Sequence, residues 1–246
     1  MGVTELGLHG VYMICYESSI ILRYNATTHQ RLADIDIKGM RLPHSIVACE
    51  QTSQLYVADI REYIWRMSPE GDDIKSVSDT LKPWSLSVTS TRLLVTSQAT
   101  NQLIQLDAEG DELRRVQLPD EMVPWHAVES PAGTFIIRHY IARLNRHQVC
   151  EVNTDGKVLR QFSGSRLSSL GHAPHFAVDS RGNVFVPDFH SCRVLLLDAQ
   201  LTLRRCIIDE HQLNYKQPRR LCYTEQTGQL LVAVARSVAV FDVLRR

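Results

Sequence analysis

Arginine, histidine and aromatic residues gather at a short phrase that recurs five times along the chain. The five copies, each opening with proline, are Pro43-His44-Ser45-Ile46-Val47, Pro83-Trp84-Ser85-Leu86-Ser87, Pro124-Trp125-His126-Ala127-Val128, Pro174-His175-Phe176-Ala177-Val178 and Pro218-Arg219-Arg220-Leu221-Cys222. Guanidinium groups bind phosphate or carboxylate with two parallel hydrogen bonds, and aromatic rings stack on flat ligands. These residue types at a repeated position predict a surface that binds an anion.

The spacing of the phrase predicts the fold. Its copies begin about 40 to 50 residues apart, which is the period of a repeat architecture. Each copy is followed by short β-rich runs, such as Leu55–Asp59 and Tyr63–Met67, and by polar turns that contain Gly71 or Gly110. With no helical period, this pattern predicts an all-β chain. We expect a six-bladed β-propeller of four-stranded antiparallel blades, forming one domain over residues 1–246.

One blade is expected to be incomplete, because the last unit has no fourth run of strand-forming residues. If residues 4–8 begin the first blade, the last blade lacks its outer strand. If they close the last blade, the first blade lacks its inner strand. The sequence leaves both arrangements open, and we expect further segments in a longer parent protein.

Composition and charge exclude several classes of protein. The formal net charge is zero, so the charge of the whole chain favours neither nucleic acid nor membranes as partners. The hydrophobic content of 44% is ordinary for a globular chain. No apolar run reaches the length of a membrane span, and the first residues do not form a signal peptide. The six cysteines are scattered without a C-x-x-C pair, which predicts free thiols in the cytoplasm. We expect no cofactor.

One unit resembles a known repeat. It runs Pro174-His175-Phe176-Ala177-Val178-Asp179, then Gly182-Asn183, then Val184-Phe185-Val186-Pro187-Asp188, then Arg193-Val194-Leu195-Leu196-Leu197-Asp198. This order resembles an NHL repeat, and Leu55–Asp59 repeats its second half. The resemblance implies an NHL-like propeller similar to the C-terminal domain of tripartite-motif ubiquitin ligases, where such domains recruit RNA or protein and are not catalytic. In that pattern Asp59 and Asp188 hold the following turn, which is a structural role.

The expected ligand site lies on one side of the predicted propeller. In such a fold the starts of inner strands and the ends of second strands share a face, and here that face has an excess of basic residues. The segment 138–150 supplies much of this charge. The candidate ligand-binding residues are Arg138, His139, Tyr140, Arg143, Arg146, His175, Phe189, His190, Arg193, Arg219, Arg220, Arg236, Trp84 and Trp125.

These residues predict RNA as the first ligand, with arginines on phosphates and rings on bases. The alternative is an acidic or phosphorylated segment of a partner protein bound by the same face. Residues 138–147 could also be an ordinary solvated turn, and the two tryptophans could cap the core. We expect Arg138→Glu with Arg143→Glu to abolish ligand binding without unfolding the domain, because loop residues contribute little packing.

A remote alternative is an enzyme. His44, His126 and His175 lie at or next to the position after the leading proline, and three histidines could bind zinc. This is similar to peptidyl-amidating lyases, which are built from NHL-like blades. However, the three histidines do not alternate evenly along the repeats, and the secretory signal and cysteine pairs of that family are missing. We therefore expect a non-catalytic domain without a metal site.

Overall fold

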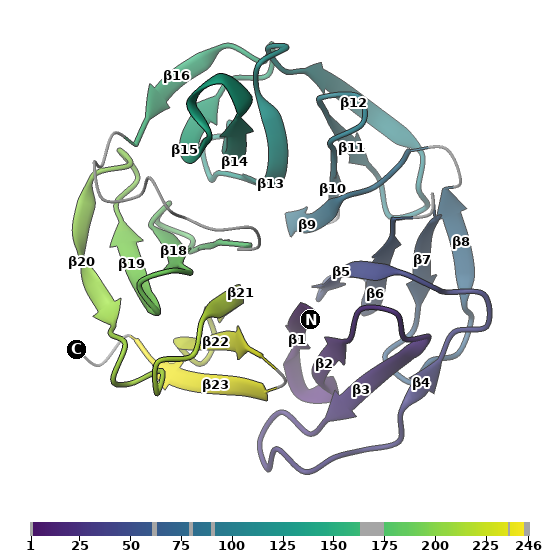
Figure 1. The fold of residues 1–246 in the computed structure, drawn as a ribbon. Coiled ribbons are helices and arrows are strands. Elements are labelled where there is room, and N and C mark those ends of the chain that lie inside the picture. The colour runs from purple at the N-terminus through teal and green to yellow at the C-terminus, as the bar shows by residue number, and fades with distance from the viewer. Residues whose placement is uncertain are drawn as a thin grey trace. The chain divides into compact units, whose positions relative to one another are not determined.

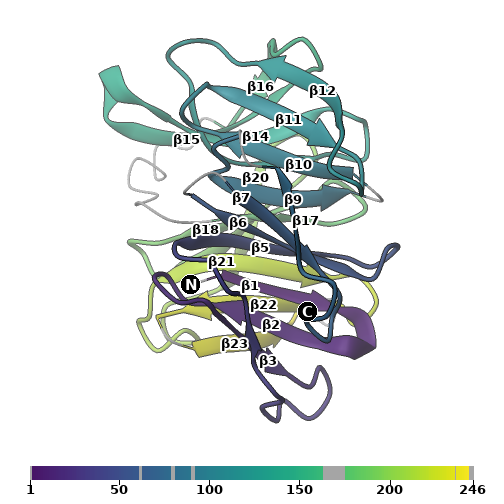
Figure 2. The ribbon, with the colours of Figure 1, turned by 90° about the vertical axis from the view of Figure 1, so that its right-hand side faces the viewer.

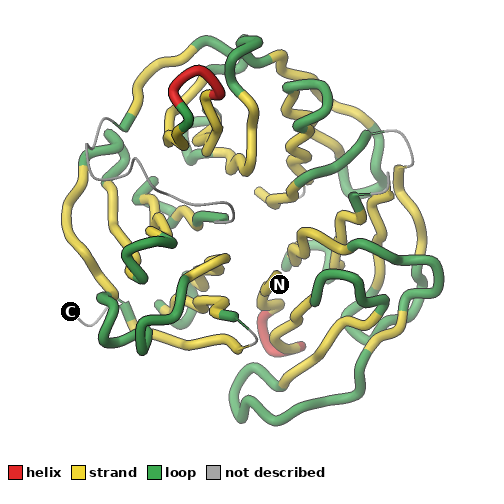
Figure 3. The backbone as a smooth tube through the Cα atoms, in the orientation of Figure 1, coloured by secondary structure: helices red, strands yellow, loops and turns green. Residues whose placement is uncertain are grey.

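The computed structural model describes residues 2–60, 63–78, 81–89, 92–162, 175–235 and 237–243. Its contacts divide the chain into two compact units, Met1–Val116 and Gln117–Arg246, and each is described by itself. Among the described residues the helical turns are two short 3-10 helices, η1 (Gly7–His9) and η2 (Ala142–Leu144), and the other regular elements are strands (Figure 3). The chain is an all-β, six-bladed propeller, which confirms the predicted fold class.

The first unit holds three four-stranded antiparallel sheets (Figure 1). The first blade contains β1 (Gly2–Leu6), β2 (Gly10–Ile14), β3 (Ile20–Tyr24) and β4 (Ile35–Asp36). The second contains β5 (Pro43–Cys49), β6 (Gln54–Asp59), β7 (Tyr63–Met67) and β8 (Lys75–Ser78). The third contains β9 (Ser85–Thr89), β10 (Arg92–Ser97), β11 (Gln102–Leu106) and β12 (Glu112–Gln117).

The second unit holds two four-stranded sheets and one of three strands. The fourth blade contains β13 (Val123–Glu129), β14 (Phe135–Ile141), β15 (Arg146–Val152) and β16 (Val158–Gln161). The fifth contains β17 (Ala177–Val178), β18 (Val184–Asp188), β19 (Arg193–Leu197) and β20 (Leu203–Ile208). The sixth contains β21 (Pro218–Thr224), β22 (Gln229–Val234) and β23 (Ser237–Asp242), which lie side by side in Figure 2.

The pairing of β1 decides the question that the sequence left open. Val3 faces Met13 and Leu6 faces Gly10 across the β1–β2 ladder, so the N-terminal residues form the inner strand of the first blade. The sixth blade therefore has three strands within the described part of the chain. Its third strand, β23, is the outer edge of that sheet.

Turns between third and fourth strands are closed by an acidic or amide side chain. Asp107, Asn153 and Asp198 each follow a third strand, and each side-chain Oδ1 accepts backbone N–H bonds of 2.8 to 3.0 Å from residues two to four positions later. Gly110 completes the first of these turns at a φ of 101°. A Cβ there would lie 2.8 Å from the carbonyl oxygen of Val77, so the close packing of this turn requires glycine.

Apolar side chains fill the space between successive sheets within each unit. In the first unit, Tyr12 of β2 and Ile46 of β5 belong to one cluster, which joins the first two blades. In the second unit, Ile136 of β14 and Val186 of β18 share a cluster that joins the fourth and fifth. Each sheet thus buries a face against its neighbour, which explains the near-continuous apolar sequence of the second strands.

Two buried aspartates lie at the ends of second strands, and the contacts of Asp188 agree with the turn-holding role that the resemblance implied. Asp59 is 1% exposed and accepts the backbone N–H of Arg41 at 2.8 Å. Asp188 is fully buried and accepts from Nε of Arg193 at 2.9 Å. The Asp188 carboxylate therefore spans the turn that follows β18, whereas the Asp59 carboxylate holds the segment that leads into β5.

Replacing Asp188 tests this structural role. Asp188→Ala should lower the free energy of unfolding by about 2–3 kcal/mol, because it leaves Arg193 without its buried acceptor. The control is Asp34→Ala, which breaks the exposed 2.7 Å pair between Asp34 and Arg31 and should cost less than about 1 kcal/mol. Urea unfolding followed by tryptophan fluorescence measures both. Equal losses in the two variants would contradict the assignment.

Candidate anion site in the second unit

The recurring phrase forms a β-bulge. The ladder register shifts between Pro43 and Ser45, between Pro124 and His126, and between Pro218 and Arg220. The extra residues at these bulges are His44, Trp125 and Arg219. A bulge turns the side chain of its extra residue away from the regular alternation. The phrase positions are therefore equivalent in these three blades, as their sequence period predicted.

In the first unit the phrase residues join two neighbouring blades. Nδ1 of His44 lies 2.8 Å from the carbonyl oxygen of Trp84, and the two rings are 4.3 Å apart between centroids. The backbone N–H of Leu86 donates to Oγ of Ser45 at 3.1 Å. Trp84 is half-buried by these contacts, which agrees with the capping alternative for this tryptophan.

In the second unit the phrases bring three polar side chains together. The rings of His126 and His175 are stacked, with centroids 4.1 Å apart and planes 19° from parallel. Nη1 of Arg220 lies 2.7 Å from Nδ1 and 2.6 Å from Nε2 of His175. A neutral imidazole has one acceptor nitrogen, so one of these contacts is the hydrogen bond. The backbone of His175 also bonds to that of Arg219 and Leu221, which holds the fifth-blade phrase against β21.

Arg138 and His139 lie on strand β14 and not in a loop, which corrects the prediction for this segment. Arg138 is opposite His126 in the β13–β14 ladder and is 1% exposed. His139 is opposite Pro124, is 2% exposed and places Nδ1 3.5 Å from Sγ of Cys150. Strand β14 continues to Ile141, so the turn between β14 and β15 consists of η2 and Asn145. We name Arg138, His126, His175 and Arg220 the inner cluster.

Burial controls the charge of the inner cluster. Desolvation, with the nearby cations Arg220 and Arg138, lowers the pKa of His126 to about 3. Desolvation also lowers the pKa of Arg138 to about 9 and that of Arg220 to about 9. At neutral pH the site therefore combines an uncharged His126 with two buried guanidinium cations. A bound anion would offset the cost of burying these charges.

Outside the inner cluster, burial lowers the pKa of His139 to about 4 and raises that of the Cys150 thiol to about 12. A thiol with that pKa is not a nucleophile at neutral pH. All six cysteines are free. On this side of β14, His139 and Cys150 therefore pack in the core.

The other predicted site residues of the second unit have different surroundings. Arg143 pairs with Glu121 at 2.7 Å and Arg193 pairs with Asp188, while Arg219 lies 5.5 Å from the ring centroid of Phe189. Tyr140 donates to Asn145 at 2.9 Å. Arg146 and His190 are exposed. Arg236 lies outside the described residues, and Trp84 belongs to the first unit.

Two residues of this region were absent from the predicted ligand site. His126 was weighed as a zinc ligand, and its place in the phrase beside Trp125 also puts it on the predicted ligand face. His147 is 7% exposed and lies with its ring centroid 5.1 Å from those of Trp125 and Tyr140. No sequence signal distinguishes it from an exposed turn residue, because its burial depends on the length of β15.

The inner cluster favours anion binding over the zinc alternative. Arg220 contacts His175, and a guanidinium cation beside an imidazole opposes the approach of a metal cation. In the described part of the chain, no group of three or more His, Cys, Asp or Glu residues is close enough to hold a metal ion. Nor do the described helices include one long and apolar enough to cross a membrane.

Comparisons with known proteins support the fold. No family model matches the chain, and no curated protein matches its sequence. Three solved structures illustrate the structural similarity. The WD40 propeller domain of Doa1 has a TM-score of 0.69 at 15% identity, covering 99% of this chain and 78% of that one. A nidogen/laminin complex gives 0.69 at 14%, covering 95% and 89%. A streptogramin B lyase gives 0.66 at 8%, covering 97% and 91%.

The burial of Arg138 changes what charge reversal should do. Arg138→Glu should lower the free energy of unfolding by at least about 2 kcal/mol, because it places a carboxylate at a buried strand position. Arg143→Glu changes an exposed pair and should cost less than about 1 kcal/mol. Thermal unfolding followed by circular dichroism compares the two. Wild-type stability in Arg138→Glu would contradict the buried placement.

Buried histidines should make the protein less stable in mild acid. In the unfolded chain His126 and His139 bind protons near pH 6.5. In the folded chain the pKa of His126 is about 3 and that of His139 is about 4, so both stay neutral until the pH is much lower. The free energy of unfolding should therefore fall as pH drops from about 6.5 to 4, by up to about 1.4 kcal/mol per pH unit for each histidine. Urea unfolding across this range measures the slope. His126→Gln and His139→Gln should each flatten it, and slopes equal to that of the parent would refute the shifts.

Proposed function

We propose that this propeller is a non-catalytic recognition module that binds an acidic segment of a partner protein. The inner cluster receives one carboxylate or phosphate group of that segment. The observation that supports the proposal is the grouping of two buried arginines with the stacked pair His126 and His175. Arg220 contacts His175, and Arg138 lies opposite His126 in the β13–β14 ladder. A propeller fold is consistent with such a role, since its blades present loops and strand ends to a partner.

Burial makes the inner cluster suitable for a single anionic group. Arg220 is 7% exposed and Arg138 is 1% exposed, so Arg220 is the more accessible of the two arginines and Arg138 adds to the positive field. Charge-assisted hydrogen bonds are strongest where water is excluded. The low pKa of His126 keeps its ring neutral, so that the ring can accept or donate one hydrogen bond without adding a third charge.

The same geometry favours a peptide over RNA, the ligand that the sequence placed first. RNA binding without base pairing uses a row of exposed cations along several phosphates. Here Arg143 and Arg193 are already paired with Glu121 and Asp188, and Arg138 and Arg220 are buried. One of the structures similar in fold is a nidogen/laminin complex, in which a propeller chain assembles with a protein. The NHL resemblance fits protein recruitment equally well, including a role in selecting ubiquitin ligase substrates.

A labelled acidic peptide tests the proposal. Fluorescence anisotropy of fluorescein-labelled hexaglutamate, and of the same peptide with a central phosphoserine, should show saturable binding to the wild-type protein. Arg220→Gln should weaken binding by at least about tenfold, because it removes the guanidinium group that faces the ligand. Arg143→Gln should change affinity by less than about twofold, because Arg143 is exposed and paired with Glu121.

Competing outcomes are distinguishable in the same assay. A random pool of single-stranded RNA should bind more weakly than the acidic peptide at physiological salt. Tight RNA binding that weakens steeply as the salt concentration rises would show that the protein binds several phosphates of RNA. The peptide proposal would then be wrong. Circular dichroism of Arg220→Gln controls for unfolding. Equal peptide affinity in folded Arg220→Gln and in the parent would also remove the inner cluster as the site.

A further inference from the structure

Among the residues that the structure describes, no fourth strand covers the third strand of the sixth blade. In the third and fifth blades the third strands, β11 and β19, are largely buried: Leu103 and Val194, for example, are fully buried. In β23 every residue is exposed or half-buried, and Val240 is 37% exposed. The difference follows from the three-stranded sheet, since the described chain has no strand beyond β23. An apolar strand with an open edge is a template for pairing.

A groove lies beside this edge. It has a volume of about 680 Å³ and runs between β20 of the fifth blade and β23 of the sixth, which neighbour each other in Figure 1. One wall carries Arg205, Ile207 and Asp209, and the other carries Val240, Phe241 and Asp242. The groove therefore has a mixed lining, with apolar side chains such as Val240 and Ile207 beside the charged groups of Arg205, Asp209 and Asp242.

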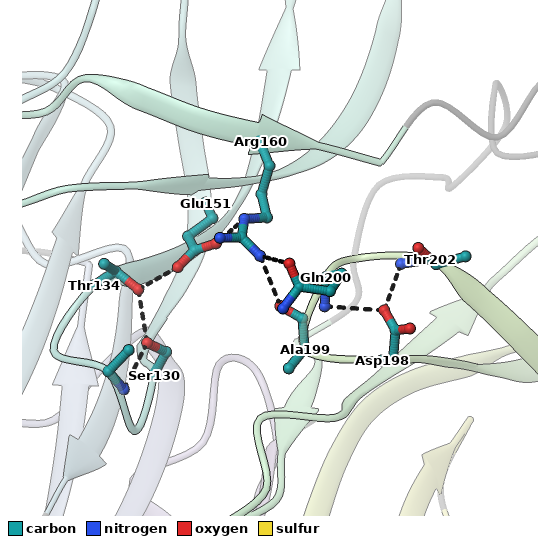
Figure 4. Close-up of polar contacts among 9 residues, drawn as sticks. Ser130, Thr134, Glu151, Arg160, Asp198, Ala199, Gln200 and Thr202 are labelled. Carbon is teal, nitrogen blue, oxygen red and sulfur yellow. Dashed lines mark hydrogen bonds and ion pairs between the residues drawn. The ribbon is translucent and has the colours of Figure 1, made fainter.

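The junction between the fourth and fifth blades shows how such a space is filled when both blades have four strands (Figure 4). Arg160 of β16 pairs with Glu151 at 2.7 Å and donates to the carbonyl oxygen of Ala199 and to the side chain of Gln200. Ala199 and Gln200 belong to the turn that leads into β20. The fourth strand of one blade thus contacts the fourth-strand turn of the next.

The register of the strand pairs identifies the equivalent residues at the junction between the fifth and sixth blades. Arg205 faces Leu196 across β19–β20 as Arg160 faces Glu151 across β15–β16, so Arg205 has the position of Arg160. Asp242 follows Phe241 as Asp198 follows Leu197, and it has the position of Asp198.

In the fifth blade, Asp198 forms a 2.7 Å ion pair with Arg204 of the fourth strand. In the sixth blade the equivalent carboxylate, Asp242, is exposed and accepts from Nε2 of Gln229 at 3.1 Å. An arginine in a fourth strand beside β23 would therefore meet a carboxylate at the position where the fifth blade has one.

We propose that the β23 edge binds an extended segment of a partner protein, which pairs antiparallel with β23 and completes the sixth blade. The segment alternates apolar and basic residues, with an arginine placed to pair with Asp242. This surface is separate from the inner cluster and binds a ligand of opposite charge.

The backbone of β23 is oriented for this pairing. The N–H of Val243 donates to the carbonyl oxygen of Gly228, the residue that directly precedes β22. Because antiparallel ladders alternate, the N–H groups of Val238, Val240 and Asp242 point toward the open edge. A segment lying in the groove would accept hydrogen bonds from them and cover Val240. This is recognition by strand addition, in which main-chain bonds give affinity and side chains give specificity.

The chain's own fourth strands define the chemistry of the segment. β12 contains Leu113-Arg114-Arg115-Val116, and β20 contains Leu203-Arg204-Arg205-Cys206. Both place two arginines between apolar residues. A synthetic peptide with the sequence of residues 112–118, Glu-Leu-Arg-Arg-Val-Gln-Leu, is therefore a suitable probe.

Hydrogen exchange with this peptide tests the proposal. At saturating peptide, the amide exchange of Val238 and Val240 should slow at least about tenfold. A peptide with proline in place of its second arginine should give no protection, because proline cannot adopt this pairing. Asp242→Lys should reduce affinity for the peptide at least about fivefold by charge repulsion. Glu109→Lys, the same charge change at an exposed turn of the first unit, should leave affinity unchanged.

Tethering the peptide to the protein allows amide protection to be measured when the free peptide binds weakly. The same seven residues joined after residue 246 by a glycine–serine linker reach millimolar effective concentration. They should protect Val238 and Val240 as the free peptide does, and the proline version should not. Failure of both forms to protect these amides would overturn the proposal. Protection that appears without peptide and rises with protein concentration, together with dimers in sedimentation, would assign the edge to a second copy and overturn it as well.

Discussion

A twisted four-stranded sheet cannot bury its two faces by itself, and this constraint governs the structure. Within each unit every sheet packs against the next, and the clusters around Tyr12 and Val186 fill the spaces between them. The second strands are apolar on both sides because both sides meet a neighbour. Packing of this kind positions strand ends accurately, so side chains from separate repeats can form one site.

The inner cluster is a result of that packing. His126, His175 and Arg220 come from three successive phrases of the second unit, and the spacing of the sheets brings their side chains into contact. The bulges after Pro124 and Pro218 change the direction of the following side chain, which a regular strand would not do. Two guanidinium groups are then buried beside neutral imidazole. Burying charge is costly, and an anionic ligand would offset part of that cost, which is why we propose the ligand site here and not at the exposed arginines.

The two proposed surfaces differ in physical origin. The inner cluster is polar and buried, and its specificity comes from charge held in a low-dielectric site. The β23 edge is an incomplete sheet, and its specificity comes from main-chain pairing and from Asp242. A module with both could hold an acidic segment and a basic strand of the same assembly at once. The orientation of one relative to the other is set within the second unit, because all of the residues involved belong to it.

The sequence by itself determined the repeat, the all-β class, the number of blades and the buried turn aspartates, because these depend on local alternation and on a period visible in one dimension. It also placed Arg138, His175 and Arg220 together as candidates. Only the tertiary structure decided that Arg138 lies on a strand, that residues 2–6 open the first blade and that β23 is the edge of the sixth sheet among the described residues. Burial and strand partners depend on contacts between residues far apart in the chain, and a pattern of residue types does not specify those distances.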